Sequence, residues 1–212
     1  MTARTPWQVW HEPYADEASP LSRRLRLVQQ HIAAWLDQRS AERLTVVSAC
    51  AGQGHDLIGV LASRSDVQRV RGTLLEYDPG NVAAARTAAD QAGLTKIVIR
   101  RADAGQLSSY AGAVPADLVL MVGVFGNISD ADVERTVAAL PQLCAESATV
   151  IWTRARRDPD LTPALREWLR DAGFVEHAFH APDDVQFSVG VHRLDSPPQP
   201  LDPTGTIFTF LR

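Results

Sequence analysis

Two glycines stand where an apolar segment gives way to an amphipathic segment of helical length. Residues 48–56 run Ser-Ala-Cys-Ala-Gly-Gln-Gly-His-Asp, with Gly52 and Gly54 near the centre. Glycine lets a ligand approach the backbone closely, and a helix start offers free N–H groups and a partial positive charge. This combination suits a nucleotide or a carboxylate. A GxG turn also occurs simply because a chain must reverse sharply, so this turn alone leaves both interpretations open.

A carboxylate follows the glycines at an informative distance. Glu76 ends the next apolar segment, about two dozen residues beyond Gly52. That spacing matches the acid that accepts hydrogen bonds from ribose hydroxyls in Rossmann-type sites, although an acid can also merely end a strand. Asp78 has a competing structural role as a helix cap, because Pro79 suits the first helical position. Glu76 is therefore the better ribose candidate.

Two later turns complete the set of candidate ligand-binding turns. One is Ala102-Asp103-Ala104 and the other, at 123–127, is Gly-Val-Phe-Gly-Asn. Ligands of open α/β sheets bind beyond the carboxyl ends of the strands. If all four turns follow parallel strands, we expect them to face one crevice.

The elements that would position these turns form an α/β pattern. From residue 44 onward, compact apolar segments alternate with amphipathic segments of helical length, which is typical of a parallel sheet with crossover helices. The predicted strands are 44–50, 70–76, 96–101, 117–123 and 149–154, and the predicted helices are about 54–63, 79–92, 130–140 and 160–171. Segments 174–181, 185–194 and 206–212 alternate at period two without intervening helices. We expect them to be closing strands with at least one antiparallel pair.

The first 40 residues differ from the rest. An aromatic arm with Trp7, Trp10 and Tyr14 precedes a predicted helix over 20–38, whose apolar residues recur at three- and four-residue intervals. We divide the chain into an arm and helix at 1–40 and a main domain at 41–212. The arm fits a lid over a bound molecule and fits packing against the core equally well.

The order of these motifs resembles that of the class I S-adenosylmethionine-dependent methyltransferases over roughly residues 40–195. The family's first motif, acidic-x-Gly-x-Gly-x-Gly, falls on Ser48, Cys50, Gly52 and Gly54. The two later glycines match, whereas the acid and the first glycine are replaced. The resemblance implies a Rossmann-like, mostly parallel seven-stranded sheet with helices on both faces and an antiparallel closing strand.

The resemblance also implies contacts to S-adenosylmethionine as the cofactor. Glu76 would bind both ribose hydroxyls, Tyr77 would cover the adenine, and Asp103 would accept a hydrogen bond from the adenine amino group. The segment 117–127 would lie beside the methionine part of the cofactor and the methyl acceptor. The complete set of expected contacts is Tyr14, Ala51, Gly52, Gly54, Glu76, Tyr77, Asp78, Ala102, Asp103, Ala104, Gly123, Val124 and Phe125.

The predicted function is methyl transfer to a small molecule. The segment 117–127 lacks the Asn/Asp-Pro-Pro-Tyr signature of methyltransferases that act on the amino groups of adenine or glutamine. An acceptor pocket lined by Phe125, Asn127, Trp152 and the arm's aromatics would suit a partly apolar acceptor, and Arg154 and Arg156 could admit an anion.

Two alternatives stay open. A nicotinamide (NAD(P)) oxidoreductase shares the first half of the pattern, but its fingerprint requires Gly or Ala where this chain has Leu57. A non-catalytic protein that binds S-adenosylmethionine or S-adenosylhomocysteine would tolerate the replacements at Ser48 and Cys50.

Histidines are the candidates for a general base, which is needed only if the acceptor arrives protonated. His11 in the arm and His180 near a predicted crevice end are our choices. His177 and His180 are three residues apart in a predicted strand, so their rings should point to opposite faces, and we expect no metal site.

Composition limits the partners and the compartment. The net charge is -4 and the sequence pI is near 5.8, which argues against a global field for nucleic acids or anionic membranes. The two cysteines, Cys50 and Cys144, have no zinc-site spacing and cannot form a disulfide framework. No apolar stretch approaches 18 residues. We therefore expect a cytoplasmic protein with no membrane-spanning segment.

Overall fold

The central feature is a seven-stranded sheet. The computed structural model describes residues 16, 19–39 and 42–211. Its strands lie in the order β3-β2-β1-β4-β5-β7-β6, with the first five parallel and β7 antiparallel to both neighbours. They are β1 (Leu44–Ala49), β2 (Val70–Glu76), β3 (Ile97–Arg101), β4 (Ala116–Met121), β5 (Cys144–Ala155), β6 (Phe174–His180) and β7 (Phe187–Leu194). The predicted Rossmann-like sheet is confirmed.

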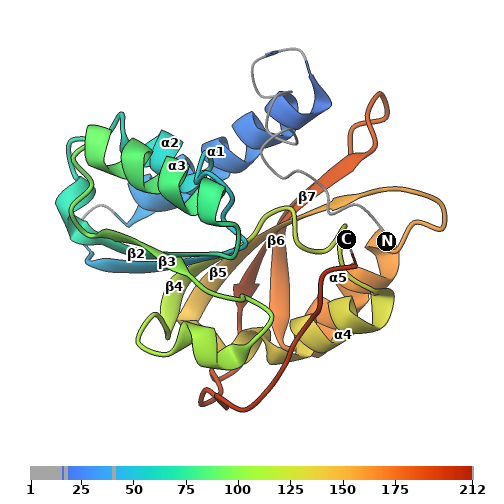
Figure 1. Ribbon diagram of the computed structural model, residues 1–212. Coiled ribbons are helices and arrows are strands. Elements are labelled where there is room, and N and C mark those ends of the chain that lie inside the picture. The colour runs from blue at the N-terminus through green and yellow to red at the C-terminus, as the bar shows by residue number, and fades with distance from the viewer. Residues whose placement is uncertain (1–15, 17–18, 40–41, 212) are drawn as a thin grey trace, which may run out of the picture.

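Helices cover both faces of the sheet (Figure 1). One face carries α1 (Pro20–Gln38), α2 (Leu57–Leu61) and α3 (Pro79–Gln91), and the other carries α4 (Asp130–Ala139) and α5 (Thr162–Asp171). Single 3-10 turns occupy η2 (Val67–Arg69), η3 (Leu107–Tyr110) and η4 (Leu140–Gln142). Each face therefore buries its own apolar core, and the central strands are apolar on both sides, as parallel strands between helix layers must be.

Local capping chemistry sets where the helices begin. The Asp78 carboxylate accepts a hydrogen bond from Asn81 N at 2.9 Å, with Pro79 at the first helical position. The α2 helix begins at Leu57, three residues later than predicted, because the glycine turn continues through His55 and the N-terminal cap falls on Asp56. The turn before α2 is thus longer than the sequence pattern suggests.

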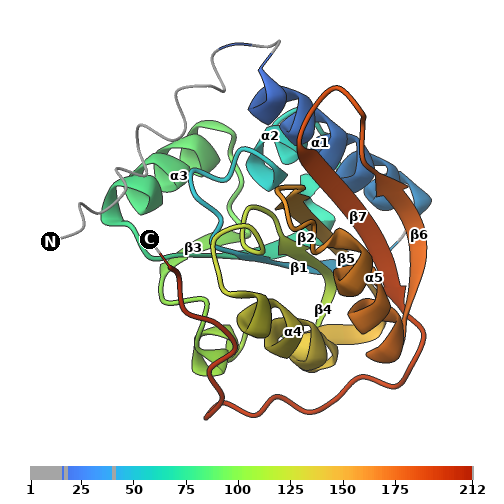
Figure 2. The ribbon, with the colours of Figure 1, turned by 90° about the vertical axis from the view of Figure 1, so that its right-hand side faces the viewer.

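The C-terminal prediction was wrong in one respect. Segment 206–212 does not become a strand of the sheet; its described part forms only two isolated bridges, Gln106 with Thr206 and Ile128 with Phe210. The partner edge of β7 is already taken by β6, and Ile207 and Phe208 are instead buried in the core beneath α4. We call Gly205–Leu211 the C-terminal strap; it runs past α4 in dark red in Figure 2.

A β-bulge reorients the end of β6. The register against β7 shifts between Glu176 and Ala178, which inserts one extra residue at His177. Glu176 faces α5, where it pairs with Arg166, whereas His180 faces α1. Without the bulge, residues 176 and 180 would share a face, because strand side chains alternate.

The described part of the chain contains no helix that combines the length and the apolar character needed to cross a membrane.

Candidate functional site

The glycine turn after β1 is held in a left-handed backbone conformation. The φ angles are +51° at Cys50, +56° at Gly52 and +77° at Gly54. Ala51 N donates to Leu75 O and Gly54 N donates to Ala51 O, both at 2.9 Å. A β-carbon at Gly54 would lie 2.5 Å from the Ile58 side chain, so α2 packs directly on this glycine. Cys50 adopts the same left-handed region without glycine's freedom, which costs backbone strain.

Glu76 links the glycine turn to the end of β2. Its carboxylate accepts from Gly52 N at 2.7 Å through Oε2 and from Asp78 N at 2.8 Å through Oε1. The side chain is buried, and burial raises the pKa of Glu76 against the opposing effect of its backbone hydrogen bonds. A carboxylate has about four lone-pair positions, so acceptor capacity remains for ribose hydroxyls.

The neighbours of Glu76 fill distinct positions. Tyr77 is 61% exposed, which leaves its ring free to cover a planar ligand, whereas Asp78 is committed to capping α3. The loop after β3 joins this group through Ala102 N, which donates to Glu76 O at 3.0 Å. The ends of β1, β2 and β3 are therefore fastened to one another by hydrogen bonds.

Asp103 lies exposed at the end of the β3 loop. Its Oδ1 accepts from Gly105 N at 2.8 Å, which orients the carboxylate. Ala104 is buried, and its carbonyl accepts from the Tyr110 hydroxyl at 2.9 Å. The free oxygen of Asp103 is thus available to a ligand, while Ala104 can contribute only through its backbone.

The two departures from the family's glycine motif have different surroundings. The Ser48 hydroxyl is buried and makes no hydrogen bond to any residue that the structure describes. The Cys50 thiol lies near Glu76 and Asp103, and burial together with these carboxylates raises the pKa of Cys50 well above its usual value. The thiol therefore stays protonated and acts as a small turn side chain, not as a nucleophile.

The loop after β4 is held from β5. Gly123 N donates to the Thr153 hydroxyl at 2.9 Å, and Asn127 Nδ2 donates to Gly123 O at 2.7 Å. A β-carbon at Gly123 would meet nothing within 4 Å, so this backbone borders open space. The side chains of Val124 and Phe125 are fully buried, so only their backbone can meet a ligand.

The predicted acceptor pocket needs correction. Phe125 and Trp152 do not line an open pocket; both are fully buried and their ring centroids lie 6.3 Å apart in the core. Arg154 donates to Phe125 O and pairs with Asp130 at 3.0 Å, and Arg156 donates to Pro182 O and Val185 O. Both guanidinium groups thus stabilise loops of the protein, which removes the basis for assigning them to an anionic acceptor.

Helix α1 contacts both the glycine turn after β1 and the region where β6 ends. Gln29 Nε2 donates to His55 O in the glycine turn at 2.8 Å. Farther along the edge, His31 Nε2 lies 2.9 Å from His180 Nε2, and Arg23 pairs with Asp184 at 2.6 Å. Because β6 runs parallel to β5, His180 does reach the crevice end of the sheet. His11 and Tyr14, the two site candidates in the N-terminal arm, lie outside the described residues.

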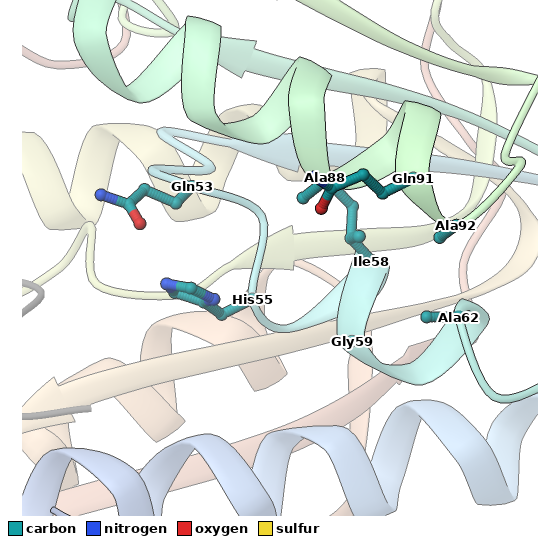
Figure 3. A pocket seen from close by; sticks show the side chains of 8 residues that line it. All are labelled: Gln53, His55, Ile58, Gly59, Ala62, Ala88, Gln91 and Ala92. Atoms are coloured by element: carbon teal, nitrogen blue, oxygen red, sulfur yellow. The ribbon is translucent and has the colours of Figure 1, made fainter. Parts of the chain in front are cut away.

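A pocket of about 450 Å³ lies beside the glycine turn, between α2 and α3 (Figure 3). Gln53 and His55 stand at one end, and small side chains of the two helices line much of the rest. The lining residues are Gln53, His55, Ile58, Gly59, Ala62, Ala88, Gln91 and Ala92. None of the predicted ligand contacts is among them. This pocket is on the outer flank of the turn and does not include the strand ends.

Known proteins match this chain in structure, whereas two comparisons by sequence find no match. No protein-family model and no curated protein matches this chain. An O-methyltransferase family protein from Burkholderia thailandensis superposes with a TM-score of 0.67 at 15% identity, over 91% of this chain and 60% of that one. This chain thus spans less than two thirds of that neighbour's length.

Two further structures match at greater coverage of their own chains. Magnesium protoporphyrin IX methyltransferase from Synechocystis PCC 6803, with bound S-adenosylmethionine, gives a TM-score of 0.64 at 17% identity over 89% of this chain and 91% of that one. The 1,6-didemethyltoxoflavin-N1-methyltransferase from Burkholderia thailandensis, with bound 1,6-didemethyltoxoflavin and S-adenosylhomocysteine, gives a TM-score of 0.63 at 18% identity. That match covers 90% of this chain and 84% of that one. The chain has the class I methyltransferase fold. In this methyltransferase fold, the strand ends that carry Gly52, Glu76 and Asp103 form one edge of the sheet.

Proposed function

We propose that this chain is an S-adenosylmethionine-dependent methyltransferase that acts on a small molecule. The observation that carries the proposal is the Glu76 carboxylate, which ties Gly52 to Asp78 and keeps lone pairs free. Asp103 and the exposed Tyr77 stand at the neighbouring strand ends. Structural neighbours that bind S-adenosylmethionine or S-adenosylhomocysteine and act on small molecules support the same conclusion.

The described residues fit this cofactor. Glu76 would hold the ribose hydroxyls, Asp103 would accept from the adenine amino group, and Tyr77 would cover the ring. The open space at Gly123 would admit the methionine part beside the loop after β4. Ala51, Gly52 and Gly54 would supply the close backbone approach, and the arm would add Tyr14. S-adenosylmethionine, when bound, supplies an electrophilic methyl group on a sulfonium.

The contribution of the protein is mainly alignment and exclusion of water. An in-line displacement at a sulfonium loses charge in the transition state, so positioning the acceptor accounts for much of the acceleration. His180 and His11 are our candidates for a base where the acceptor carries a proton. In the tautomer in which His180 Nε2 donates to His31 Nε2, His180 Nδ1 is the unprotonated nitrogen that would accept the proton.

A non-catalytic binding protein is the second candidate. Cys50 in a left-handed turn position and the unpartnered Ser48 hydroxyl both depart from the family motif, and a sensor or subunit partner would tolerate both. The intact set of Gly52, Gly54, Glu76 and Asp103 serves cofactor binding in both candidates, and the methyltransferase names of the structural neighbours are what favour methyl transfer. The same proposal places the protein in the cytoplasm, a reducing compartment that suits its free cysteines, Cys50 and Cys144.

Calorimetry against S-adenosylmethionine, S-adenosylhomocysteine, NAD and NADP tests the cofactor. We expect both sulfur compounds to bind and neither dinucleotide to do so; absence of S-adenosylhomocysteine binding at millimolar ligand would overturn the proposal. Transfer of a radiolabelled methyl group into small molecules of a cell extract then separates an enzyme from a sensor. Binding without label transfer would favour the sensor.

A further inference from the structure

The C-terminal strap contacts the loop that carries Asp103. Ile207 N donates to Gly105 O at 2.8 Å, and Leu107 N donates to Gly205 O at 2.9 Å. The Thr206 hydroxyl also lies 2.9 Å from Gln106 Oε1. The strap thus pairs with this loop through one antiparallel bridge, Gln106 with Thr206, immediately beyond the proposed adenine-binding carboxylate.

The same strap contacts the loop after β4. Leu211 N donates to Asn127 O at 3.0 Å, and Phe210 forms a bridge with Ile128. Asn127 in turn donates its side-chain amide to Gly123 O. One continuous segment of seven residues therefore joins the adenine end of the proposed site to its methyl-transfer end.

The middle of the strap is anchored firmly. Ile207 and Phe208 are 2% and 1% exposed in the core. Thr209 N donates to Asp132 Oδ2 at 3.2 Å, and the Thr136 hydroxyl lies 3.1 Å from Ile207 O, both on α4. Buried apolar residues and satisfied backbone groups resist local opening, so the strap has little freedom to let the two loops move separately.

We infer that the strap positions the two cofactor-binding loops as one unit, with Gly105, Asn127 and Ile207 as the positioning residues. This inference rests on the proposed function for its effect on cofactor affinity. The connection runs from Ile207 to Gly105 and on to Asp103, whose carboxylate accepts from Gly105 N. At the other end it runs from Leu211 to Asn127 and on to Gly123. Asp103 and Gly123 are therefore each one hydrogen-bonded neighbour away from the strap.

Gly105 is the sensitive position in this arrangement. A β-carbon there would lie 2.2 Å from Phe208 O and 3.1 Å from Asp103 Oδ1. Its backbone is not in the left-handed region, so alanine strains the contact with the strap and not the local conformation. Gly105→Ala therefore displaces the strap, the loop or both, with the smallest possible chemical change.

Hydrogen exchange of the ligand-free protein tests the coupling directly. In Gly105→Ala we expect faster amide exchange at 123–128, on the far side of the strap, as well as at 102–107. Asn127→Ala supplies the reverse test and should speed exchange at 102–107, which keeps the inference testable if Gly105→Ala does not fold. Thr204→Ala is the control, because this exposed residue precedes the strap and bonds to Asp202. Exchange changes confined to the mutated loop in both variants would overturn the inference.

Calorimetry with S-adenosylhomocysteine and adenosine measures the consequence for binding. Gly105→Ala should weaken S-adenosylhomocysteine roughly tenfold, equivalent to about 1.4 kcal/mol. Asn127→Ala should weaken S-adenosylhomocysteine more than adenosine, which lacks the methionine part. Equal affinities in Gly105→Ala and the Thr204→Ala control would also overturn the inference. If the wild-type protein binds neither compound, the proposed function fails, while the exchange experiment still decides the coupling.

Discussion

The two halves of the crevice edge are built in different ways. In the cofactor half, at the ends of β1, β2 and β3, the two carboxylates are oriented by partners nearer in the chain: Glu76 bonds Gly52 across 24 residues and Asp103 bonds Gly105 across two. In the other half, formed by β5, the β6–β7 turn and α1, the deciding pairs are remote in the chain. His31 and His180 are 149 residues apart, and Arg23 and Asp184 are 161 apart. Partners nearer in the chain thus orient the carboxylates of the first half, whereas packing between more remote segments forms the second.

Packing between β5 and β7 should give the largest effect. A β-carbon at Gly190 would lie 2.2 Å from the ring of buried Trp152, which has no room to move. We expect Gly190→Ala to lower the free energy of unfolding by about 3 kcal/mol, at the upper end for overpacking. Urea unfolding measures this loss, and adding Trp152→Leu should recover part of it. A change within the error of the wild-type value would show that this half of the sheet is looser than the geometry implies.

Acid should weaken the same half through His192. Its Nδ1 accepts from Trp152 Nε1 at 3.2 Å, and burial lowers the pKa of His192 to about 4 despite the opposing effect of Glu176. As pH falls, His192 is protonated in the unfolded chain at a higher pH than in the folded protein. Its contribution to the free energy of unfolding is therefore fully present above pH 6.5 and is lost as pH drops from 6.5 to about 4. The loss reaches about 3 kcal/mol at most. Urea unfolding at a series of pH values should show that the free energy of unfolding depends less on pH in His192→Gln than in the wild type. An equal slope in the variant would contradict the assignment.

Glu76 offers the sharpest test of the cofactor half. Glu76→Ala leaves the partly buried N–H groups of Gly52 and Asp78 without their acceptor and removes the proposed ribose contact. We expect S-adenosylhomocysteine affinity to fall roughly 100-fold, equivalent to about 2.7 kcal/mol. In the wild type, acid should weaken binding at a higher pH than for an ordinary glutamate, because burial raises the pKa of Glu76.

Asp117→Ala is the matched control for Glu76→Ala, because it also removes the acceptor of a backbone N–H group. The Asp117 carboxylate accepts this hydrogen bond from Thr45 N at 2.7 Å, but at the opposite end of the strands. Calorimetry should show unchanged S-adenosylhomocysteine affinity in this variant, even if stability drops. Equal losses in the two variants would mean that Glu76 acts only through folding.

Cys50 should be a site where a substitution improves the protein. Its φ of +51° is unfavourable for any residue with a β-carbon, so Cys50→Gly should stabilise the fold by about 1 kcal/mol. Cys50→Ala keeps the strain and serves as the comparison. Thermal unfolding should place Cys50→Gly above both the wild type and Cys50→Ala. A Cys50→Gly midpoint at or below that of Cys50→Ala would show that the thiol's packing outweighs its backbone strain.

The smallest effect belongs to the contact between His31 and His180. A double-mutant cycle with alanine at both positions should give a coupling free energy of about 0.5–1 kcal/mol at pH 8, typical of one partly buried hydrogen bond. Burial and the neighbouring ring lower the pKa of His31, so the coupling should shrink as pH falls below 6.5. Zero coupling at pH 8 would indicate that α1 is held to β6 by apolar packing alone.

Prediction from the sequence succeeded where information was local. Apolar strands ending in Glu76, or followed by Asp103 and Gly123, defined the sheet and its edge, because the carboxyl ends of parallel strands meet at one side. The sequence did not reveal the length of the glycine turn. The predicted helix began at about residue 54, whereas α2 begins after its N-terminal cap, Asp56. The roles of Arg154, Arg156 and Trp152 were also missed, because strand periodicity does not reveal which partner a side chain meets.

The sequence by itself determined the alternation of strands and helices, the left-handed glycine turn and the acids at the strand ends. These features depend on backbone preference and on period-two or period-3.6 patterns within short segments. Only the tertiary structure decided that a bulge at His177 turns His180 toward α1, and that the C-terminal strap lies outside the sheet and joins two loops. The bulge lies between neighbouring strands, but the contact of His180 with His31 and the contacts of the strap with the two loops join segments that are 82 to 149 residues apart, from Ile128 with Phe210 to His31 with His180. There edge availability and burial outweigh local strand preference.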